Sequence, residues 1–231
     1  MVNILSIDWD YFIPLKREWT GSYMENNRYR NLKWYERYFD YKRKGQNLET
    51  TVNVDSNLLN SFINDINTKF KLDKANIYVS DSHKTSYYIA KENKCNTIYS
   101  FDAHTDLGYG GLNSLQFEVN CANWLGKLLW ESFIDTAYII LSPYSFEHKD
   151  QFKEINSKFN IEYITMDEIK DLPDISFIHI ARSGAWTPPW LDHHLFYLID
   201  SFNKPYTVLN LKHRHWNPED ITLADMLGNI I

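Results

Sequence analysis

The chain has 231 residues, enough to bury a sizeable core in one large α/β domain. Its net charge of −6 argues against nucleic acid as a partner, because domains that bind phosphate backbones are usually basic. Two cysteines cannot build a disulfide framework, and no apolar run approaches the ~20 residues of a membrane span or forms a signal peptide at the start. We therefore expect a cytoplasmic protein without nucleic-acid or membrane partners.

Short apolar runs alternate with segments of helical spacing along the chain. Strands are predicted at residues 3–7, 77–79, 97–101, 137–141, 161–164, 177–181 and 206–211. Helices are predicted at residues 56–66, 84–91, 120–130, 146–159 and 191–202. Because strands that alternate with helices form βαβ units, we expect residues 1–231 to form a single-domain three-layer α/β/α fold with a mostly parallel sheet.

Residues 28–44 combine basic and aromatic side chains, and two interpretations remain open for them. In the first, they form a helix whose aromatic face covers the domain while its basic face is solvated. In the second, the segment docks an acidic peptide, with stacking on the rings. The 8 Trp, 16 Tyr and 13 Phe of the chain also favour an aromatic cleft, since so many large rings cannot all be buried.

The segment after the strand at residues 97–101 carries three residues of metal-ligand type, which are Asp102, His104 and Asp106. The crevice above the carboxyl ends of parallel strands is where open α/β proteins bind ligands. Two carboxylates and an imidazole that converge there suit a divalent cation. The alternative is a capping aspartate, a solvated aspartate and an ordinary, partly buried histidine.

Two other predicted strands end in residues of the same type. Asp8 and Asp10 follow the first strand, and His83 follows the strand at residues 77–79. Six such ligands can hold two divalent metals if two carboxylates bridge, and a water between metals ~3.5–4 Å apart becomes a hydroxide nucleophile near neutral pH. The convergence of three strand ends favours a two-metal site over chance.

These motifs resemble those of a known family. The segment Asp102-Ala103-His104-Thr105-Asp106 looks like the Asp-Ala-His-x-Asp signature of the arginase/ureohydrolase superfamily. Asp8-Trp9-Asp10 resembles its Asp-x-Asp motif, and His83 its single upstream histidine. In ordinary arginases the Asp-x-Asp pair comes after the central motif, whereas here it comes first. This order resembles a divergent branch that includes peptide arginases, which convert arginine side chains of ribosomally made precursor peptides to ornithine.

The resemblance implies an arginase-like fold that holds two Mn²⁺ ions. Four carboxylates and two histidines also favour manganese, because zinc prefers tetrahedral nitrogen and sulfur ligands. Carried over residue by residue, one metal takes His83, Asp102, Asp106 and Asp8, and the other takes His104, Asp102, Asp8 and Asp10. Asp8 and Asp102 would then bridge the two metals.

The implied reaction is attack of a bridging hydroxide on the guanidinium carbon of arginine, with release of urea. His104 and Asp106 would lie at the catalytic centre, where Asp106 relays the proton. The arginase histidine that shuttles protons has no counterpart between Asp106 and Leu141. The candidates to replace it are His193, His194, His213 and His215.

Substrate contacts are expected from the loops around the metals. Glu118 and Asp192 are candidate partners for the guanidinium group, since a carboxylate can bind it in a bidentate way. Arg182 would pair with a ligand carboxylate or a backbone carbonyl of the substrate. The cleft wall would come from Ser183, Trp186 and Trp190. Asn120 and Asn123 occupy the region where arginases contact the amino-acid end of free arginine, but those contacts are not clearly kept, which favours a peptide substrate.

Three other functions remain as alternatives. An apolar strand that leads into Asp8-x-Asp10 also opens phosphatases of the haloacid-dehalogenase type, in which Asp8 would be the nucleophile with magnesium. A zinc deacetylase on the related fold shares an Asp-x-His element but normally uses one metal. A metal-bearing domain without catalytic activity could bind a peptide through the aromatic cleft.

Overall fold

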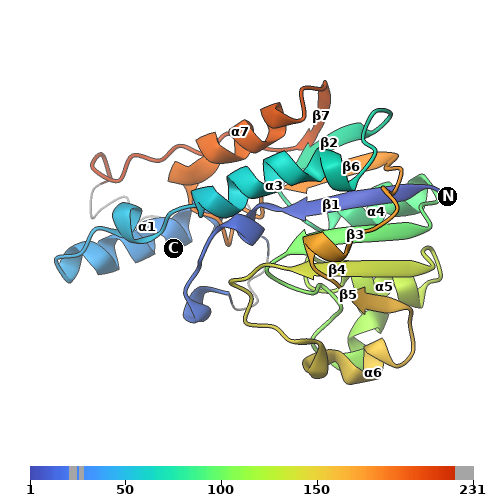
Figure 1. The fold of residues 1–231 in the computed structure, drawn as a ribbon. Helices are drawn as coiled ribbons and strands as arrows, with labels where there is room; N and C mark the ends of the chain where they lie inside the picture. The colour runs from blue at the N-terminus through green and yellow to red at the C-terminus, as the bar shows by residue number, and fades with distance from the viewer. Residues whose placement is uncertain (21–24, 26–28, 222–231) are drawn as a thin grey trace.

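The computed structural model of the chain describes residues 1–20, 25 and 29–221, which form one sheet with helices on both faces (Figure 1). Within these residues the strands are β1 (Asn3–Asp8), β2 (Asn76–Ser80), β3 (Thr97–Asp102), β4 (Thr136–Leu141), β5 (Ile161–Tyr163), β6 (Phe177–Ala181) and β7 (Tyr206–Asn210). Every neighbouring pair is parallel. The strands expected from the sequence are confirmed, with ends that differ by at most one residue.

The strand order is β5-β4-β3-β1-β6-β2-β7, which places β1 near the middle of the sheet. From β1 the chain crosses over to β2 on one side, and it then returns past β1 to reach β3 on the other side. Such a reversal leaves a crevice above the carboxyl ends of the strands, where α/β proteins bind ligands. The carboxyl ends of β3, β1, β6 and β2 meet at this point.

Helices cover both faces of the sheet, which confirms the three-layer α/β/α architecture (Figure 1). The helices α3 (Ser56–Lys69) and α7 (Asp192–Ser201) pack on one face, whereas α4 (Thr85–Glu92), α5 (Trp124–Trp130) and α6 (Lys153–Asn156) pack on the other. In α3 the buried residues Leu59, Phe62 and Ile66 recur at helical spacing, and Asp55 caps the amino terminus. None of the described helices is long and apolar enough to cross a membrane.

Alternation along the strands divides the core into two apolar clusters. In β1, Leu5 and Ile7 belong to the cluster under α3 and α7, while Ile4 belongs to the cluster under α4 and α5. The next residue on the α4 side is Ser6, which is completely buried. The sheet face under α4 therefore turns polar just before β1 reaches the ligand-type residue Asp8.

The helix α1 (Tyr29–Arg43) covers the domain beside α7, as the first interpretation of residues 28–44 expects; residue 28 lies outside the described residues. Trp34 is completely buried, and the Arg37 guanidinium lies 4.3 Å from its ring centroid and 4.8 Å from that of Trp19. On the outer face, Lys33 and Lys42 form ion pairs with nearby acids. These contacts support the interpretation in which the segment covers the domain.

Two predicted helices are shortened by three or more residues at an end, and the helix predicted at residues 56–66 continues to Lys69. The helix predicted at residues 120–130 starts only at Trp124, because residues 120–123 form a turn held by asparagine side chains. The helix predicted at residues 146–159 is reduced to η4 (Lys149–Phe152) and α6, where the side-chain amide of Asn156 donates to the Lys149 carbonyl. The remaining helical segments are α2 (Leu48–Thr51), η1 (Trp9–Phe12), η2 (Arg17–Trp19), η3 (Gly111–Gln116), η5 (Met166–Glu168) and η6 (Pro189–Leu191).

Candidate metal centre

The end of β1 supplies two carboxylates. Asp8 is the last residue of the strand, and its side chain accepts a hydrogen bond of 3.2 Å from the Asp10 backbone N–H, which starts the tight turn of η1. Both side chains are almost completely buried. The hydroxyl of Ser183, which follows β6, donates to Asp8 Oδ2 at 2.5 Å. The Asp8 carboxylate is thus held in place by a residue of the loop that follows the neighbouring strand β6.

The end of β3 supplies two more carboxylates and an imidazole. Asp102 Oδ1 accepts a hydrogen bond of 2.8 Å from the His104 backbone N–H, which turns the chain back over the sheet. Asp106 has a positive φ of 53°, a conformation that aspartate tolerates better than most residues. Its backbone carbonyl accepts from the Gly126 N–H at the start of α5, and its Oδ2 accepts from Trp124 Nε1 at 2.5 Å. Helix α5 therefore fixes the position of Asp106.

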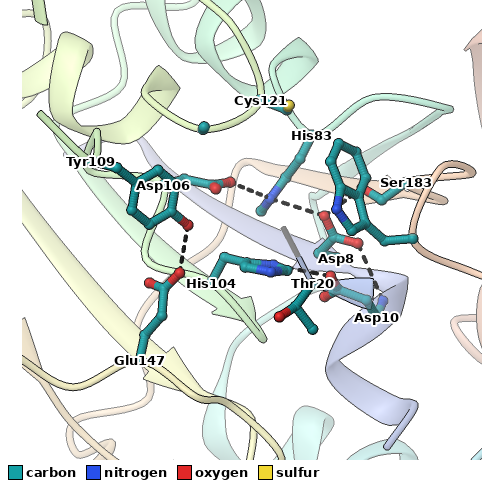
Figure 2. Close-up of a pocket in the computed structure, with 12 residues that line it drawn as sticks. Asp8, Asp10, Thr20, His83, His104, Asp106, Tyr109, Cys121, Glu147 and Ser183 are labelled. Atoms are coloured by element: carbon teal, nitrogen blue, oxygen red, sulfur yellow. Dashed lines mark hydrogen bonds and ion pairs between the residues drawn. The ribbon is translucent and has the colours of Figure 1, made fainter. Parts of the chain in front are cut away.

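His83 joins these groups from the turn between β2 and α4 (Figure 2). Its Nδ1 atom lies 2.9 Å from Asp102 Oδ2, 3.0 Å from Asp106 Oδ2 and 3.3 Å from Asp8 Oδ2. The ligand atoms of Asp8, His83 and Asp102 are mutually close enough to hold one metal ion. This group joins the ends of three strands.

A second group lies beside the first. His104 Nδ1 is 3.1 Å from Asp10 Oδ2 and 3.5 Å from Asp102 Oδ1 (Figure 2). Asp10, Asp102 and His104 again offer ligand atoms close enough for one ion. Asp102 belongs to both groups through its two oxygens, as expected of a bridging ligand. Asp8 belongs only to the first group.

The unpaired polar atoms of the cluster indicate that it is suited to bind a cation. His83 Nδ1 and Asp102 Oδ2 lie 2.9 Å apart, yet both are buried atoms without a hydrogen-bond partner. Buried polar atoms are normally paired, because leaving one unpaired costs about 1–3 kcal/mol. A divalent ion between the imidazole and the carboxylates would pair these atoms, so the donor set fits a metal.

Burial and crowding change the acid–base behaviour of the cluster. Burial, followed by the charges of Asp10 and Asp102, raises the pKa of Asp8 well above its ordinary value. Burial and Asp102 also raise the pKa of Asp106 to about 6. Burial opposes the imidazolium form of His83, but the carboxylates around it, first Asp102, outweigh this effect and raise its pKa. The metal-free cluster therefore holds protons that a divalent cation would displace.

A cavity of about 300 Å³ opens above the cluster (Figure 2). Ser183 and Trp186 line it, where the sequence places them. The described lining residues are Asp8, Asp10, Thr20, His83, His104, Asp106, Tyr109, Cys121, Ala122, Glu147, Ser183 and Trp186, and none of them is lysine or arginine. The cavity thus combines aromatic walls with an acidic floor.

Arg182 and Asp192 lie outside the residues that line this cavity. The Arg182 guanidinium is buried, where its Nε donates to Asp81 at 2.8 Å and its Nη1 donates to Asp192 at 3.0 Å. Asp192 also pairs with Arg214. The expectation that these residues contact the substrate is not supported, because each is committed to a buried ion-pair network that anchors the loop after β6. Trp190 also lies outside the lining and packs against Trp34.

The predicted contacts before α5 are likewise outside the cavity. Asn123 is buried, and its side chain accepts from the Asn120 N–H and donates to the carbonyls of Ser114 and Glu118. The Glu118 side chain is exposed. These residues brace the turn before α5, so their expected role at the substrate is not supported. The intervening pair, Cys121 and Ala122, lines the cavity instead.

Sequence reasoning missed the carboxylate of Glu147, which lines the cavity beside the Tyr109 hydroxyl (Figure 2). Glu147 Oε2 accepts from the Thr105 backbone N–H at 2.8 Å, and Oε1 accepts from the Tyr109 hydroxyl at 2.5 Å. Burial raises its pKa. The available signal was its position in the loop after β4, at the same edge of the sheet as the other acids.

The four histidines considered as proton shuttles do not line the cavity. His193 and His194 lie on α7 with their ring centroids 4.0 Å apart, and His213 and His215 lie together after β7. The prediction that one of them carries protons for the metal centre is therefore not supported. Among the described residues that line the cavity, burial and Asp102 raise the pKa of Asp106 to about 6.

Comparison with protein-family models, with curated proteins and with solved structures found no match for this chain. The case for function consequently depends on the residues of the cavity and on their chemistry. What the structure provides is a set of buried aspartate and histidine groups that could hold a metal ion.

Proposed function

We propose that the protein is a dinuclear manganese hydrolase that converts arginine side chains of a peptide to ornithine and releases urea. The observation that carries the proposal is the pair of ligand groups joined by Asp102 at the floor of an acidic cavity. Two divalent cations bound there would supply an acidified water as the nucleophile. Oxygen-rich ligand groups favour manganese over zinc.

The charge of the cavity favours a cationic substrate. Asp8, Asp10, Asp106 and Glu147 line the cavity, and the described lining contains no lysine or arginine. A phosphatase would have to attract an anion to the same surface, which these carboxylates oppose. Asp8 is moreover engaged by Ser183 and His83. The haloacid-dehalogenase alternative therefore has less support than a guanidinium substrate.

Glu147 is the carboxylate that we assign to the guanidinium group. It lines the cavity next to the ligand groups and is fixed by hydrogen bonds from the Thr105 backbone N–H and the Tyr109 hydroxyl. A partly buried carboxylate is costly without a counter-charge, and a guanidinium group would provide one through paired hydrogen bonds. The carboxylate would hold the reacting carbon over the metal-ligand floor.

Asp106 is the proposed proton carrier. Its Oδ2 atom lies 3.0 Å from His83 Nδ1, at the edge of the ligand groups, where a carboxylate could take a proton from the nucleophilic water and pass it on. Hydrolysis breaks the bond between the guanidinium carbon and the chain nitrogen, and that nitrogen must gain a proton as it leaves. Asp106 lies in the cavity wall and is oriented by Trp124. Its place beside the ligand groups allows this transfer without a histidine shuttle.

A peptide fits the outer walls better than a free amino acid does. Tyr109 and Trp186 line the cavity, and Tyr109 is half exposed. The asparagines that could have bound the amino and carboxyl groups of free arginine are used to brace a turn. Exposed aromatic rings can pack on the neighbouring residues of a peptide chain.

The test is to incubate the purified protein and Mn²⁺ with arginine-containing peptides, free arginine and agmatine, and to follow urea release and peptide mass. We expect urea from a peptide, together with a loss of peptide mass equal to urea minus the water that is added. Glu147→Gln should raise KM while bound manganese is unchanged. Glu92→Gln, on an exposed glutamate outside the cavity lining, is the matched control. Absence of urea from every substrate, despite bound metal, would overturn the proposal.

A further inference from the structure

A row of polar side chains lies directly beneath the ligand groups. Ser6 of β1 is in register with Ser100 of β3 on one side and with His179 of β6 on the other, and all three are buried. One step earlier along the same face, Ile4 is in register with Ile98. The sheet therefore places a polar layer between its apolar core and the carboxylates, where apolar side chains would be the ordinary choice.

Short hydrogen bonds connect this layer to Nε2 of His83, the ring nitrogen that points away from the carboxylates. His83 Nε2 lies 2.7 Å from Ser6 Oγ, and Ser6 Oγ lies 2.6 Å from Ser86 Oγ. Ser86 Oγ is 2.5 Å from His179 Nδ1. On its other side, His179 Nε2 is 2.9 Å from Ser80 Oγ. The bonds form one continuous chain across β1, α4, β6 and β2.

The direction of the chain follows from either end. At one end, a cation bound at His83 Nδ1 would leave the ring proton on Nε2, which would then donate to Ser6. At the other end, Ser80 Oγ lies 2.9 Å from two acceptors, the Ser82 carbonyl and Thr85 Oγ1, so it donates to one of them and accepts from His179 Nε2–H. A neutral His179 then accepts at Nδ1 from Ser86. Because each hydroxyl has a single proton to donate, the direction of the hydrogen bond at either end sets the direction of every bond between them. Both ends give the same direction, from His83 through Ser6 and Ser86 to His179.

We propose that Ser6, Ser86 and His179 are positioning residues that hold His83 protonated at Nε2, with Nδ1 presented to the metal. Burial and the nearby His83 lower the pKa of His179, which agrees with the neutral form that the chain requires. Groups that orient a ligating histidine from behind typically change metal affinity by about 10–100-fold when they are removed. The inference rests on the metal centre of the proposed function but not on its substrate.

The chain offers a matched pair of variants to test this. Ser6 and Ser100 are buried register partners, and each lies two residues before a ligand aspartate, but the hydroxyl that contacts His83 belongs to Ser6. Ser6→Ala should weaken Mn²⁺ binding in calorimetry about tenfold or more, whereas Ser100→Ala should not. A merely structural role would lower the melting temperature of the metal-free protein without changing Mn²⁺ affinity. Equal Mn²⁺ affinities for the two variants would contradict the proposal.

A second measurement needs no variant. In metal-free protein with ¹⁵N-labelled histidine, long-range ¹H–¹⁵N spectra should show His179 as the neutral Nε2–H tautomer and His83 with a proton on Nε2. A proton on His179 Nδ1 would overturn the proposed order. Because neither measurement uses a substrate, a failure to release urea and a failure of this hydrogen-bond chain remain distinguishable.

Discussion

At the residue scale, Asp102 is the residue on which metal binding should depend most, because both ligand groups include it. The sequence alone identified it with Asp8, Asp10, His83, His104 and Asp106, since each follows a strand and strand ends converge in a parallel sheet. Residues that approach the cavity from loops were less predictable. Glu147 was missed because its place depends on contacts with Thr105 and Tyr109. The role of Arg182 was mispredicted because one of its ion-pair partners, Asp81, lies in a distant part of the chain.

The substitution Asp102→Asn should abolish binding of both metals. Asparagine can still accept the hydrogen bond from the His104 backbone N–H, so the turn is preserved, but the shared negative charge is lost. Manganese content after dialysis should fall to background, as measured by elemental analysis. Asp167→Asn, on a fully exposed side chain, is the control and should bind metal like the unmodified protein. Retention of two metals by Asp102→Asn would contradict the bridging assignment.

At the scale of elements, the strands were predictable to within a residue because apolar β-branched runs have few alternatives in a buried sheet. The ends of the helices were less predictable, because asparagine side chains compete with backbone hydrogen bonding near residues 120–123 and 146–159. The close contact between α5 and the loop after β3 could not be predicted. That contact places Asp106 by hydrogen bonds to the first turn of α5.

Gly126 makes this contact possible. A Cβ atom at this position would lie 2.3 Å from the backbone carbonyl oxygen of Leu107, the residue after Asp106, so Gly126→Ala must move either the loop or the helix. We expect Mn²⁺ affinity in calorimetry to fall about tenfold, as when the support of a ligand is lost.

Gly45→Ala is the control for that substitution. Its positive φ should cost about 1 kcal/mol of unfolding free energy, but no atom lies within 4 Å of the added carbon, and metal affinity should not change. If Gly126→Ala bound Mn²⁺ as tightly as Gly45→Ala does, α5 would not position the ligand loop.

At the scale of the whole molecule, we expect the stability of the fold to depend on pH through the buried aspartate and histidine cluster. The folded, metal-free state raises the pKa of Asp8, Asp106, His83 and His104, so it binds protons more tightly than the unfolded chain does. Raised values favour folding at low pH, and this contribution declines as pH rises. For Asp106 the decline lies between 3.8 and about 6, and for the histidines it begins above 6.5.

Bound metal should reverse this dependence of stability on pH, because the metal displaces the protons that the aspartate and histidine side chains hold. We predict that the gain in melting temperature from Mn²⁺ over EDTA widens from about pH 5 to about pH 8, as affinity rises. At a metal concentration 100 times the Kd, the stabilisation should reach about 2.7 kcal/mol. Scanning calorimetry across this pH range gives the measurement. A gain that stays constant with pH would mean that the titrating cluster does not bind the metal.

The most direct test of the metal centre is anomalous diffraction at the manganese edge from crystals grown with Mn²⁺. We predict two peaks about 3.5–4 Å apart on either side of the Asp102 carboxylate, one against His83 and the other against His104. Occupied manganese sites elsewhere, with no peak beside Asp102, would contradict the account.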